Sequence, residues 1–160
     1  MIVCFARHGK AEEKKPGQSD EERKLTPEGR EDVELVARAI PVSNFVKIYT
    51  SPLTRARETA EIIARIKGGE VVVLDELAPQ RASIEALSSI ELEGDSVFVG
   101  HAPSIEDMVE AVIGGGKVKL KAGAIACVDI GDSKRLARSV GVLIALIPPS
   151  ATRPLLSANR

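Results

Sequence analysis

Residues 3–9 read Val3-Cys4-Phe5-Ala6-Arg7-His8-Gly9, and this stretch decides the fold. A short apolar run of this kind is typical of a buried strand, and here it ends at once in a cation, an imidazole and a glycine. The chain contains only two histidines, and the second, His101, follows a similar apolar run at residues 97–100. Two strand ends that each carry a histidine predict one site at the C-terminal edge of a sheet, where open α/β folds bind their ligands.

Length, composition and charge indicate a single globular domain spanning residues 1–160. Hydrophobic residues make up 44% of the chain and charged residues 28%, which is ordinary for a globular protein. The formal net charge of −1 gives no reason to expect nucleic acid or an anionic membrane as a partner. No apolar run is long enough to span a bilayer and no leader segment is apparent, so we expect a cytoplasmic protein.

Strand and helix patterns alternate along most of the chain. Strands are expected at residues 1–6, 46–49, 71–74 and 96–100, and helices after residues 26, 51, 83 and 103. Two later apolar runs, 124–130 and 140–147, flank a polar turn and predict a hairpin. The sequence thus predicts a three-layer α/β/α fold with a mostly parallel central sheet, an edge hairpin near the C-terminus and a loosely held tail over 149–160.

The two cysteines, Cys4 and Cys127, both fall within predicted strands. We interpret them as small core residues, in preference to a disulfide or a reactive thiol. Two histidines and two cysteines at these separations form no recognisable zinc site, so we expect no metal.

The charged stretch from Lys10 to Lys24 contains Pro16 and Gly17 and is expected to be a loop. It is either a solvated connection or a flap beside His8 that contacts the substrate. Composition does not decide between these two interpretations.

Two arginines accompany the histidines. Arg7 precedes His8, and Arg55 falls in the first turns of a predicted helix, near backbone amides that favour an anion. Two guanidinium groups can hold a phosphoryl group through bidentate, charge-assisted hydrogen bonds. They also disfavour the imidazolium form, so His8 would stay neutral and nucleophilic. This set of residues suits phosphoryl transfer through a covalent phosphohistidine.

Four motifs resemble those of the histidine phosphatase superfamily, which has the phosphoglycerate-mutase-like fold, and in particular its small SixA-like phosphohistidine phosphatases. The motifs are Arg7-His8-Gly9, Leu25-Thr26-Pro27-Glu28-Gly29, Ser51-Pro52-Leu53-Thr54-Arg55-Ala56 and Val99-Gly100-His101. Together with the late strand at residues 124–126, they follow the order and spacing of that family from about residue 2 to residue 147.

The resemblance implies a role for each matching residue. His8 would be the nucleophile that becomes phosphorylated, while Arg7, Arg55 and His101 would hold the phosphoryl oxygens and stabilise charge in the transition state. It implies neither a metal nor another cofactor.

Two further residues of the same motifs would support this site through their backbone. Gly9 would let the chain turn tightly, and its carbonyl would fix the tautomer of His8. Ala102, directly after His101, could add a backbone amide at a helix N-terminus.

Relatives that act on alcohol phosphates carry an acidic proton donor soon after the third strand. Glu76 is the best match for that donor, and Asp75 is the next. The alternative is that Glu76 is a surface carboxylate, because a phosphoramidate leaving group has less need of a protein acid. Among other polar residues we expect Arg57 on the exposed side of its helix, and Ser51 and Ser104 as helix caps.

Chain length bears on the substrate. Larger members of the superfamily insert helices between the third-strand acid and the second histidine, and these cover the site and select small molecules. From Glu76 to His101 this chain has room for one short helix. We therefore expect hydrolysis of phosphohistidine on a protein. A broad-specificity phosphomonoesterase acting on small phosphorylated substrates is the alternative, followed by a non-catalytic module that binds phosphorylated groups; the oligomeric state is left open.

Overall fold

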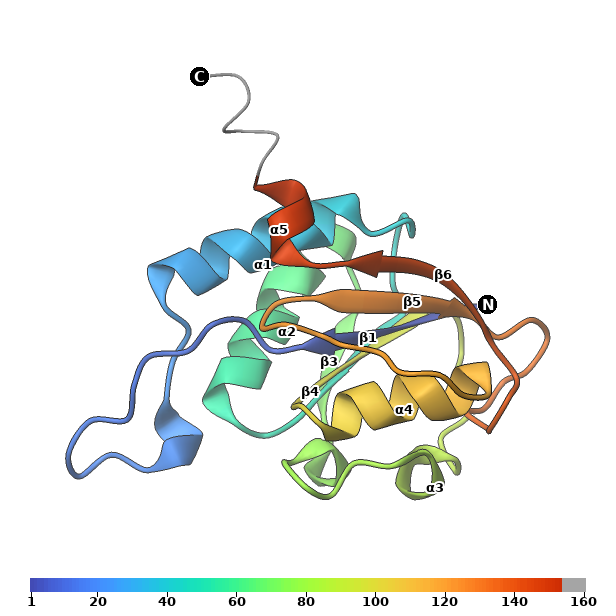
Figure 1. Ribbon diagram of the computed structural model, residues 1–160, viewed down its shortest axis with the longest axis horizontal. Coiled ribbons are helices and arrows are strands. Elements are labelled where there is room, and N and C mark those ends of the chain that lie inside the picture. The colour runs from blue at the N-terminus through green and yellow to red at the C-terminus, as the bar shows by residue number, and fades with distance from the viewer. Residues whose placement is uncertain (154–160) are drawn as a thin grey trace.

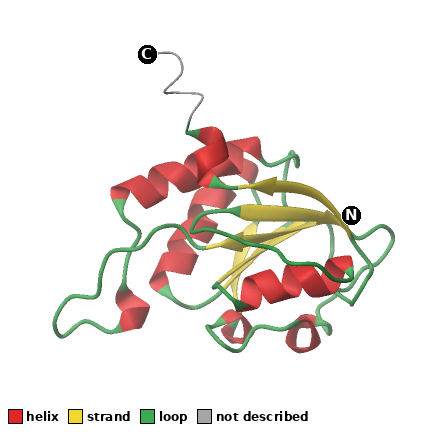
Figure 2. Cartoon of the chain, in the orientation of Figure 1, coloured by secondary structure: helices red, strands yellow, loops and turns green. Residues whose placement is uncertain are grey.

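A six-stranded mixed sheet lies between two layers of helices in the computed structural model, which describes residues 1–153 (Figures 1 and 2). The strand order is β3-β2-β4-β1-β5-β6. The strands are β1 (Ile2–Arg7), β2 (Lys47–Thr50), β3 (Glu70–Val73), β4 (Ser96–Gly100), β5 (Ile125–Asp129) and β6 (Val142–Ile147). The first four run parallel, β5 pairs antiparallel with β1, and β6 pairs antiparallel with β5. The predicted α/β fold with a mostly parallel sheet and an edge hairpin is confirmed.

Helices cover both faces of this sheet (Figure 1). One face carries α1 (Pro27–Ala39) and α2 (Thr54–Lys67), and the other carries α3 (Ile84–Leu87) and α4 (Ser104–Ile113). The remaining elements are the 3₁₀ turns η1 (Asp20–Glu22) and η2 (Asp75–Leu77) and the short helix α5 (Pro149–Thr152). None of the helices within residues 1–153 is long and apolar enough to cross a membrane.

The start of α1 also fixes the chain that follows β1. Thr26 caps the helix, since its Oγ1 accepts a hydrogen bond from the Gly29 amide at 2.9 Å, and Pro27 takes the first helical position. The Lys10 carbonyl accepts a hydrogen bond from the Thr26 amide at 2.9 Å. A Cβ at Gly29 would collide with that same carbonyl. The glycine therefore lets the segment after His8 lie directly on the first turn of α1.

Two helix boundaries differ from the prediction. α2 begins at Thr54, because Leu53 is extended and its amide donates to Ser51 Oγ at 3.1 Å. The helix predicted over residues 83–90 is the single turn α3, capped by Ser83, whose side chain accepts from the Ala86 amide.

The predicted loose tail over 149–160 is ordered in its first part. Residues 149–152 form α5, which packs against α1, and Arg153 forms an ion pair with the buried Asp32 at 3.1 Å. Pro149 is buried, so this turn has an anchor that its polar sequence did not suggest. The rest of the predicted tail, 154–160, lies outside the described residues.

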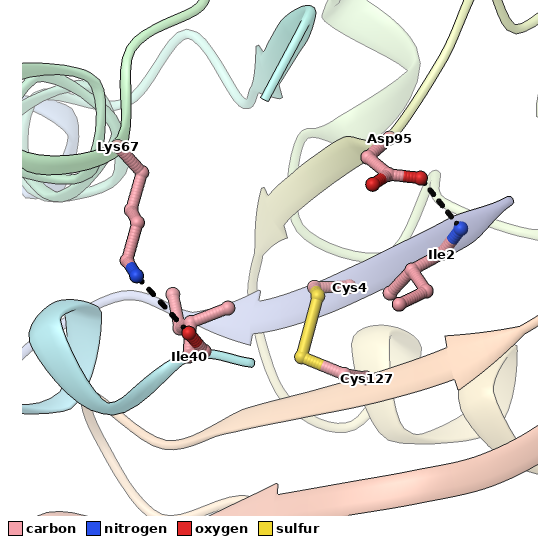
Figure 3. Close-up of a disulfide and its surroundings, with 6 residues drawn as sticks. All are labelled: Ile2, Cys4, Ile40, Lys67, Asp95 and Cys127. Atoms are coloured by element: carbon pink, nitrogen blue, oxygen red, sulfur yellow. Dashed lines mark hydrogen bonds between the residues drawn. A yellow bond between two sulfur atoms is a disulfide. The ribbon is translucent and has the colours of Figure 1, made fainter. Parts of the chain in front are cut away.

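A disulfide joins Cys4 of β1 to Cys127 of β5 (Figure 3). The two residues face each other in adjacent antiparallel strands, and both are fully buried. Their predicted place in the core is confirmed, whereas the prediction that they are not bonded to each other was wrong. They lie 123 residues apart in sequence, and only the insertion of β5 beside β1 brings them opposite one another.

Removing this disulfide is expected to destabilise the fold. The Cys4→Ala/Cys127→Ala variant should lose about 2–5 kcal/mol of unfolding free energy, because the bridge closes a long loop in the unfolded chain. For a chain of this size that corresponds to a Tm lower by roughly 5–15 °C, measurable by calorimetry. A reductant should lower the Tm of the wild type toward that of the variant and leave the variant unchanged. Equal Tm values for the two proteins under oxidising conditions would contradict a stabilising bridge.

Candidate active site

Both histidines lie at the C-terminal ends of neighbouring parallel strands, β1 and β4. His8 follows Arg7, the last residue of β1, and His101 follows Gly100, the last residue of β4. The strand register sets Arg7 opposite Gly100, and the His8 amide donates to the Gly100 carbonyl at 3.1 Å. The centroids of the two imidazole rings are 5.0 Å apart, and the rings are inclined at 55°. Residues that lie 93 positions apart in sequence therefore meet at one point of the sheet edge.

The ring of His8 is held in one orientation by its own loop. Its Nδ1 lies 2.7 Å from the carbonyl oxygen of Gly9. Because a carbonyl can only accept, Nδ1 carries the proton and Nε2 keeps its lone pair. The Gly9 amide donates to Thr59 Oγ1 at 3.0 Å, and Thr59 donates to the carbonyl of Arg55 at 2.8 Å. The loop after β1 is thus tied to α2, with Nε2 of His8 available as a nucleophile.

Arg55 lies in the first turn of α2 and is only 6% exposed. Its Nη1 donates to the carbonyl of Asp20 at 2.9 Å, and its Nη2 donates to the carboxylate of Asp20 at 3.2 Å. Asp20 belongs to η1, inside the charged loop of residues 10–24, and Arg23 of the same loop donates to the other Asp20 oxygen at 2.9 Å. This loop, called the flap below, therefore packs on the site through Asp20, and its contact with a substrate stays a prediction.

Arg7 has an unsatisfied donor. Its Nη1 donates to the carbonyl of Leu120, in the segment before β5, at 3.0 Å. Its Nε is buried and has no hydrogen-bond partner among the described residues. A buried donor without a partner destabilises a protein by about 1–3 kcal/mol, and an anion bound beside Arg7 would remove that penalty.

His101 is 4% exposed and is positioned by the end of β2. Its Nε2 lies 2.8 Å from Ser51 Oγ, the same atom that accepts from the Leu53 amide. Ser51 does not cap α2, because the N-cap is Leu53 and it has no side-chain hydrogen bond. Ser51 instead binds the Leu53 amide before the helix and is the partner of His101. Ser104 likewise does not cap α4, because its hydroxyl donates to the His101 carbonyl at 3.2 Å.

The pKa of His8 is lowered to about 4, chiefly by burial. The hydrogen bond to the Gly9 carbonyl opposes this shift, and the guanidinium groups of Arg55, Arg7 and Arg23 contribute to it. Burial and the charge of His8, followed by Arg55 and Arg7, lower the pKa of His101 to about 3. Both rings are therefore neutral at physiological pH, as a nucleophilic imidazole requires.

We accordingly expect neither histidine to titrate between about pH 5.5 and about pH 8, where an ordinary histidine does. A ring whose folded pKa of about 4 lies below the unfolded value of 6.5 contributes its full stability above about pH 6.5 and loses it as the pH falls toward 4. Ring resonances in an NMR titration give both pKa values directly, because the chain has two histidines. A midpoint near 6.5 for His8 would contradict this electrostatic picture.

Neither acidic candidate is a hydrogen-bond partner of the histidines, whose rings bond to Gly9 and Ser51. Asp75 and Glu76 lie in η2, directly after the edge strand β3, and β2 and β4 separate that strand from β1. η2 does pack against β4, and Glu76 is half-buried at the same edge of the sheet, without a hydrogen bond or ion pair to a described residue. Ala102 is partly buried between His101 and the start of α4. No group of three or more His, Cys, Asp or Glu within residues 1–153 is arranged to hold a metal ion.

Three residues of the site were missed by the sequence analysis, namely Asp20, Arg23 and Thr59. Thr59 lies four positions after Arg55, on the same face of α2, so helical spacing could have identified it. Asp20 and Arg23 directly precede the motif at residues 25–29, which lies on the chain after His8. Their position next to that motif could therefore have indicated that they lie near His8. The expected exposure of Arg57 is confirmed.

Comparisons with known proteins match most of the chain. The family model described as histidine phosphatase superfamily (branch 1) matches residues 3–111. An uncharacterized protein of Picosynechococcus sp. is 34% identical over 166 positions, 96% of this chain and 100% of that protein. The probable phosphoglycerate mutase GpmB of Photorhabdus laumondii is 32% identical over 71% of this chain and 59% of its own length. The protein histidine phosphatase SixA, solved with tungstate, has a TM-score of 0.78 and 23% identity over 94% of this chain and 98% of its own.

Proposed function

Since the chain belongs to branch 1 of the histidine phosphatase superfamily and is a phosphatase, we propose that it hydrolyses phosphohistidine on a protein through a phosphohistidine of its own. The observation that carries the choice of substrate is the short span between Glu76 and His101, which contains a single four-residue helix, α3.

That helix is part of the core. Ile84 and Leu87 are 5% and 1% exposed, and they pack in one apolar cluster with Ile105 and Met108 of α4. Figure 1 shows α3 beside α4, on one face of the sheet. A helix used in this way leaves the span without a helical cover for the C-terminal sheet edge, so a phosphorylated side chain on a folded protein could reach His8.

The reaction would proceed in two displacements. Nε2 of His8 attacks the phosphorus atom, and the bond between phosphorus and the leaving nitrogen of the substrate breaks. Water then attacks the phosphoryl group on Nε2, which yields inorganic phosphate and restores the neutral ring. Arg7 and Arg55 would bind the equatorial oxygens in both steps, and the unpaired Nε of Arg7 supports this role.

The leaving group explains why a protein acid is not essential for this substrate. A substrate imidazole that already carries a proton on its other ring nitrogen leaves as a neutral ring. An alkoxide, in contrast, must be protonated as it leaves, which is work for a general acid. Glu76 is half-buried at the same sheet edge and would serve that second case. Its position is the observation that favours the alternative, a phosphomonoesterase of broad specificity.

Rates on two substrate classes test the proposal. We expect the wild type to have a higher kcat/KM on a phosphohistidine protein than on small alkyl phosphates. Glu76→Gln should slow alkyl esters by roughly 10²-fold, the usual contribution of a general acid, and phosphohistidine by less than about 3-fold. Asp75→Asn is the matched control and should leave both rates nearly unchanged.

Each other outcome points to a different conclusion. Equal losses on both substrates in Glu76→Gln would contradict the leaving-group argument, and faster turnover of small esters by the wild type would favour the phosphomonoesterase. Loss of activity with a chelator would contradict a reaction without a metal. No turnover of any phosphorylated substrate would favour the binding module.

A further inference from the structure

The edge strand β6 is unusually apolar for an exposed element. Within residues 1–153, six large hydrophobic residues are exposed, and four of them belong to β6. These are Val142, Leu143, Ile144 and Leu146, with exposed fractions of 67%, 37%, 46% and 46%. The strand pairs with β5 alone, so one side of its backbone has no strand partner in the described chain. Edge strands of monomeric proteins are normally protected by charges, prolines or a covering element, because they pair readily with another strand.

Charges and prolines are both absent from β6, and a bulge is the one protective device that residues 142–147 contain. Residues 139–152 contain no charged side chain, although 28% of the chain is charged. Within residues 139–152, proline is found only at positions 148 and 149, after the strand has ended. In Figure 1, β6 forms the margin of the sheet next to β5. The best partner for this edge is another extended strand with aliphatic side chains on both of its faces.

A bulge gives β6 an uncommon symmetry. The pairing with β5 shifts register between Cys127 and Val128, which leaves Ile144 as an extra residue in β6. Leu143 therefore pairs with Val128 and Leu146 with Ala126, so both leucines lie on the face covered by α3 and α4.

The two ends of the strand share the opposite face. Val142 pairs with Asp129 and Ile147 with Ile125, on the face covered by α1 and α2. In a regular strand, residues 143 and 146 would point to opposite faces, as would residues 142 and 147. Because of the bulge, residues at equal distances from the centre of β6 (143 and 146, or 142 and 147) lie on the same face of the sheet.

We infer that β6 pairs with β6 of a second copy of this chain, antiparallel about a two-fold axis beside Ile144 and Ala145. This register sets Leu143 against Leu146 of the second copy and Val142 against Ile147 of the second copy, with each pair on one face of a continuous sheet. At the centre, Ile144 meets the small Ala145. A two-fold axis places each residue of β6 near the corresponding residues of the second copy. Charged side chains near the axis would therefore repel each other. The absence of charge from residues 139–152 suits this contact.

Pairing of two six-residue strands buries less than the roughly 1,600 Å² of a standard interface. We therefore expect a reversible dimer with a dissociation constant on the order of micromolar. Analytical ultracentrifugation of the full chain from about 1 to about 500 µM should show the mass rising from 17.0 kDa toward about twice that value.

Ile144→Lys should weaken the dimer at least about 100-fold, because the two-fold axis brings two desolvated lysines together. Val73→Lys is the matched control, since Val73 is 48% exposed on the opposite edge strand β3. It should leave the dimer unchanged, and both variants should keep phosphatase activity as a sign of correct folding. Should Ile144→Lys not fold, hydrogen exchange of the wild type gives the same answer, with the β6 amides protected only at high concentration.

Three results would overturn the inference. The first is a full chain that stays monomeric at all concentrations. If that chain dimerised only after deletion of residues 154–160, the chain's own end would be the partner of β6 and the inference would also fail. The second is a dimer that Val73→Lys dissociates and Ile144→Lys does not. The third is β6 amides whose exchange rate does not depend on concentration.

Discussion

His8→Ala is expected to abolish turnover of every phosphorylated substrate, with kcat lower by at least about 10⁴-fold, because the variant has no atom that can accept the phosphoryl group. The substitution should be tolerated structurally. His8 is half-buried, and the bonds that fix its loop are made by the amides of His8 and Gly9, which alanine at position 8 retains. A rate loss without a change in Tm would therefore report on chemistry.

Trapping of the phosphoenzyme identifies the acceptor. After brief incubation with ³²P-labelled substrate, the wild type should carry acid-labile label in the peptide that contains His8. His101→Ala is the matched control, because it removes the chain's other imidazole. It should slow turnover by roughly 10²–10³-fold through loss of a transition-state donor, yet still accept label on His8. Label on His101, or label retained in His8→Ala, would contradict the assignment of the nucleophile.

The meeting of His8 and His101 could be predicted from sequence because it depends on local rules. Each follows an apolar run of strand length, and consecutive parallel strands of an α/β fold end at the same edge. Arg55 was predictable for a related reason, since it falls in the first turn of the helix after β2, which lies beside β4 in the sheet. The positions of these residues in the fold follow from strand direction and helical periodicity alone.

Asp20 could not be placed in this way. It lies in a loop without periodicity, and its contact with Arg55 spans 35 residues in sequence. The same limit applies to the disulfide, because Cys4 and Cys127 become neighbours only through the position of β5 beside β1. The role of Glu76 stays a prediction. Its place after β3 could be predicted from the strand pattern, and the structure places η2 against β4, the strand that His101 follows.

Arg55→Ala is expected to have the second-largest effect, a fall in kcat/KM of roughly 10²–10³-fold, or about 2.7–4 kcal/mol of transition-state stabilisation. The guanidinium is preorganised for an anion, since it is 6% exposed and is held at the start of α2. The affinity for tungstate, a phosphate-like oxyanion, should fall in parallel when measured as competitive inhibition. Arg57→Ala is the matched control, because it removes the same charge from an exposed position on the same helix, and it should change kcat/KM by less than about 3-fold.

The contact with Asp20 offers a second explanation for any effect at Arg55, namely that the arginine only anchors the flap. Asp20→Ala separates the two roles, because it removes the ion pair at 3.2 Å and leaves the guanidinium in place. If Arg55 binds the phosphoryl group, Asp20→Ala should lower kcat/KM by less than about 10-fold and should not weaken tungstate, since an anion in the site competes with the carboxylate for the same donors. Equal losses in Arg55→Ala and Asp20→Ala would instead show that Arg55 acts through the flap, and the phosphoryl oxygens would then depend on Arg7 and His101.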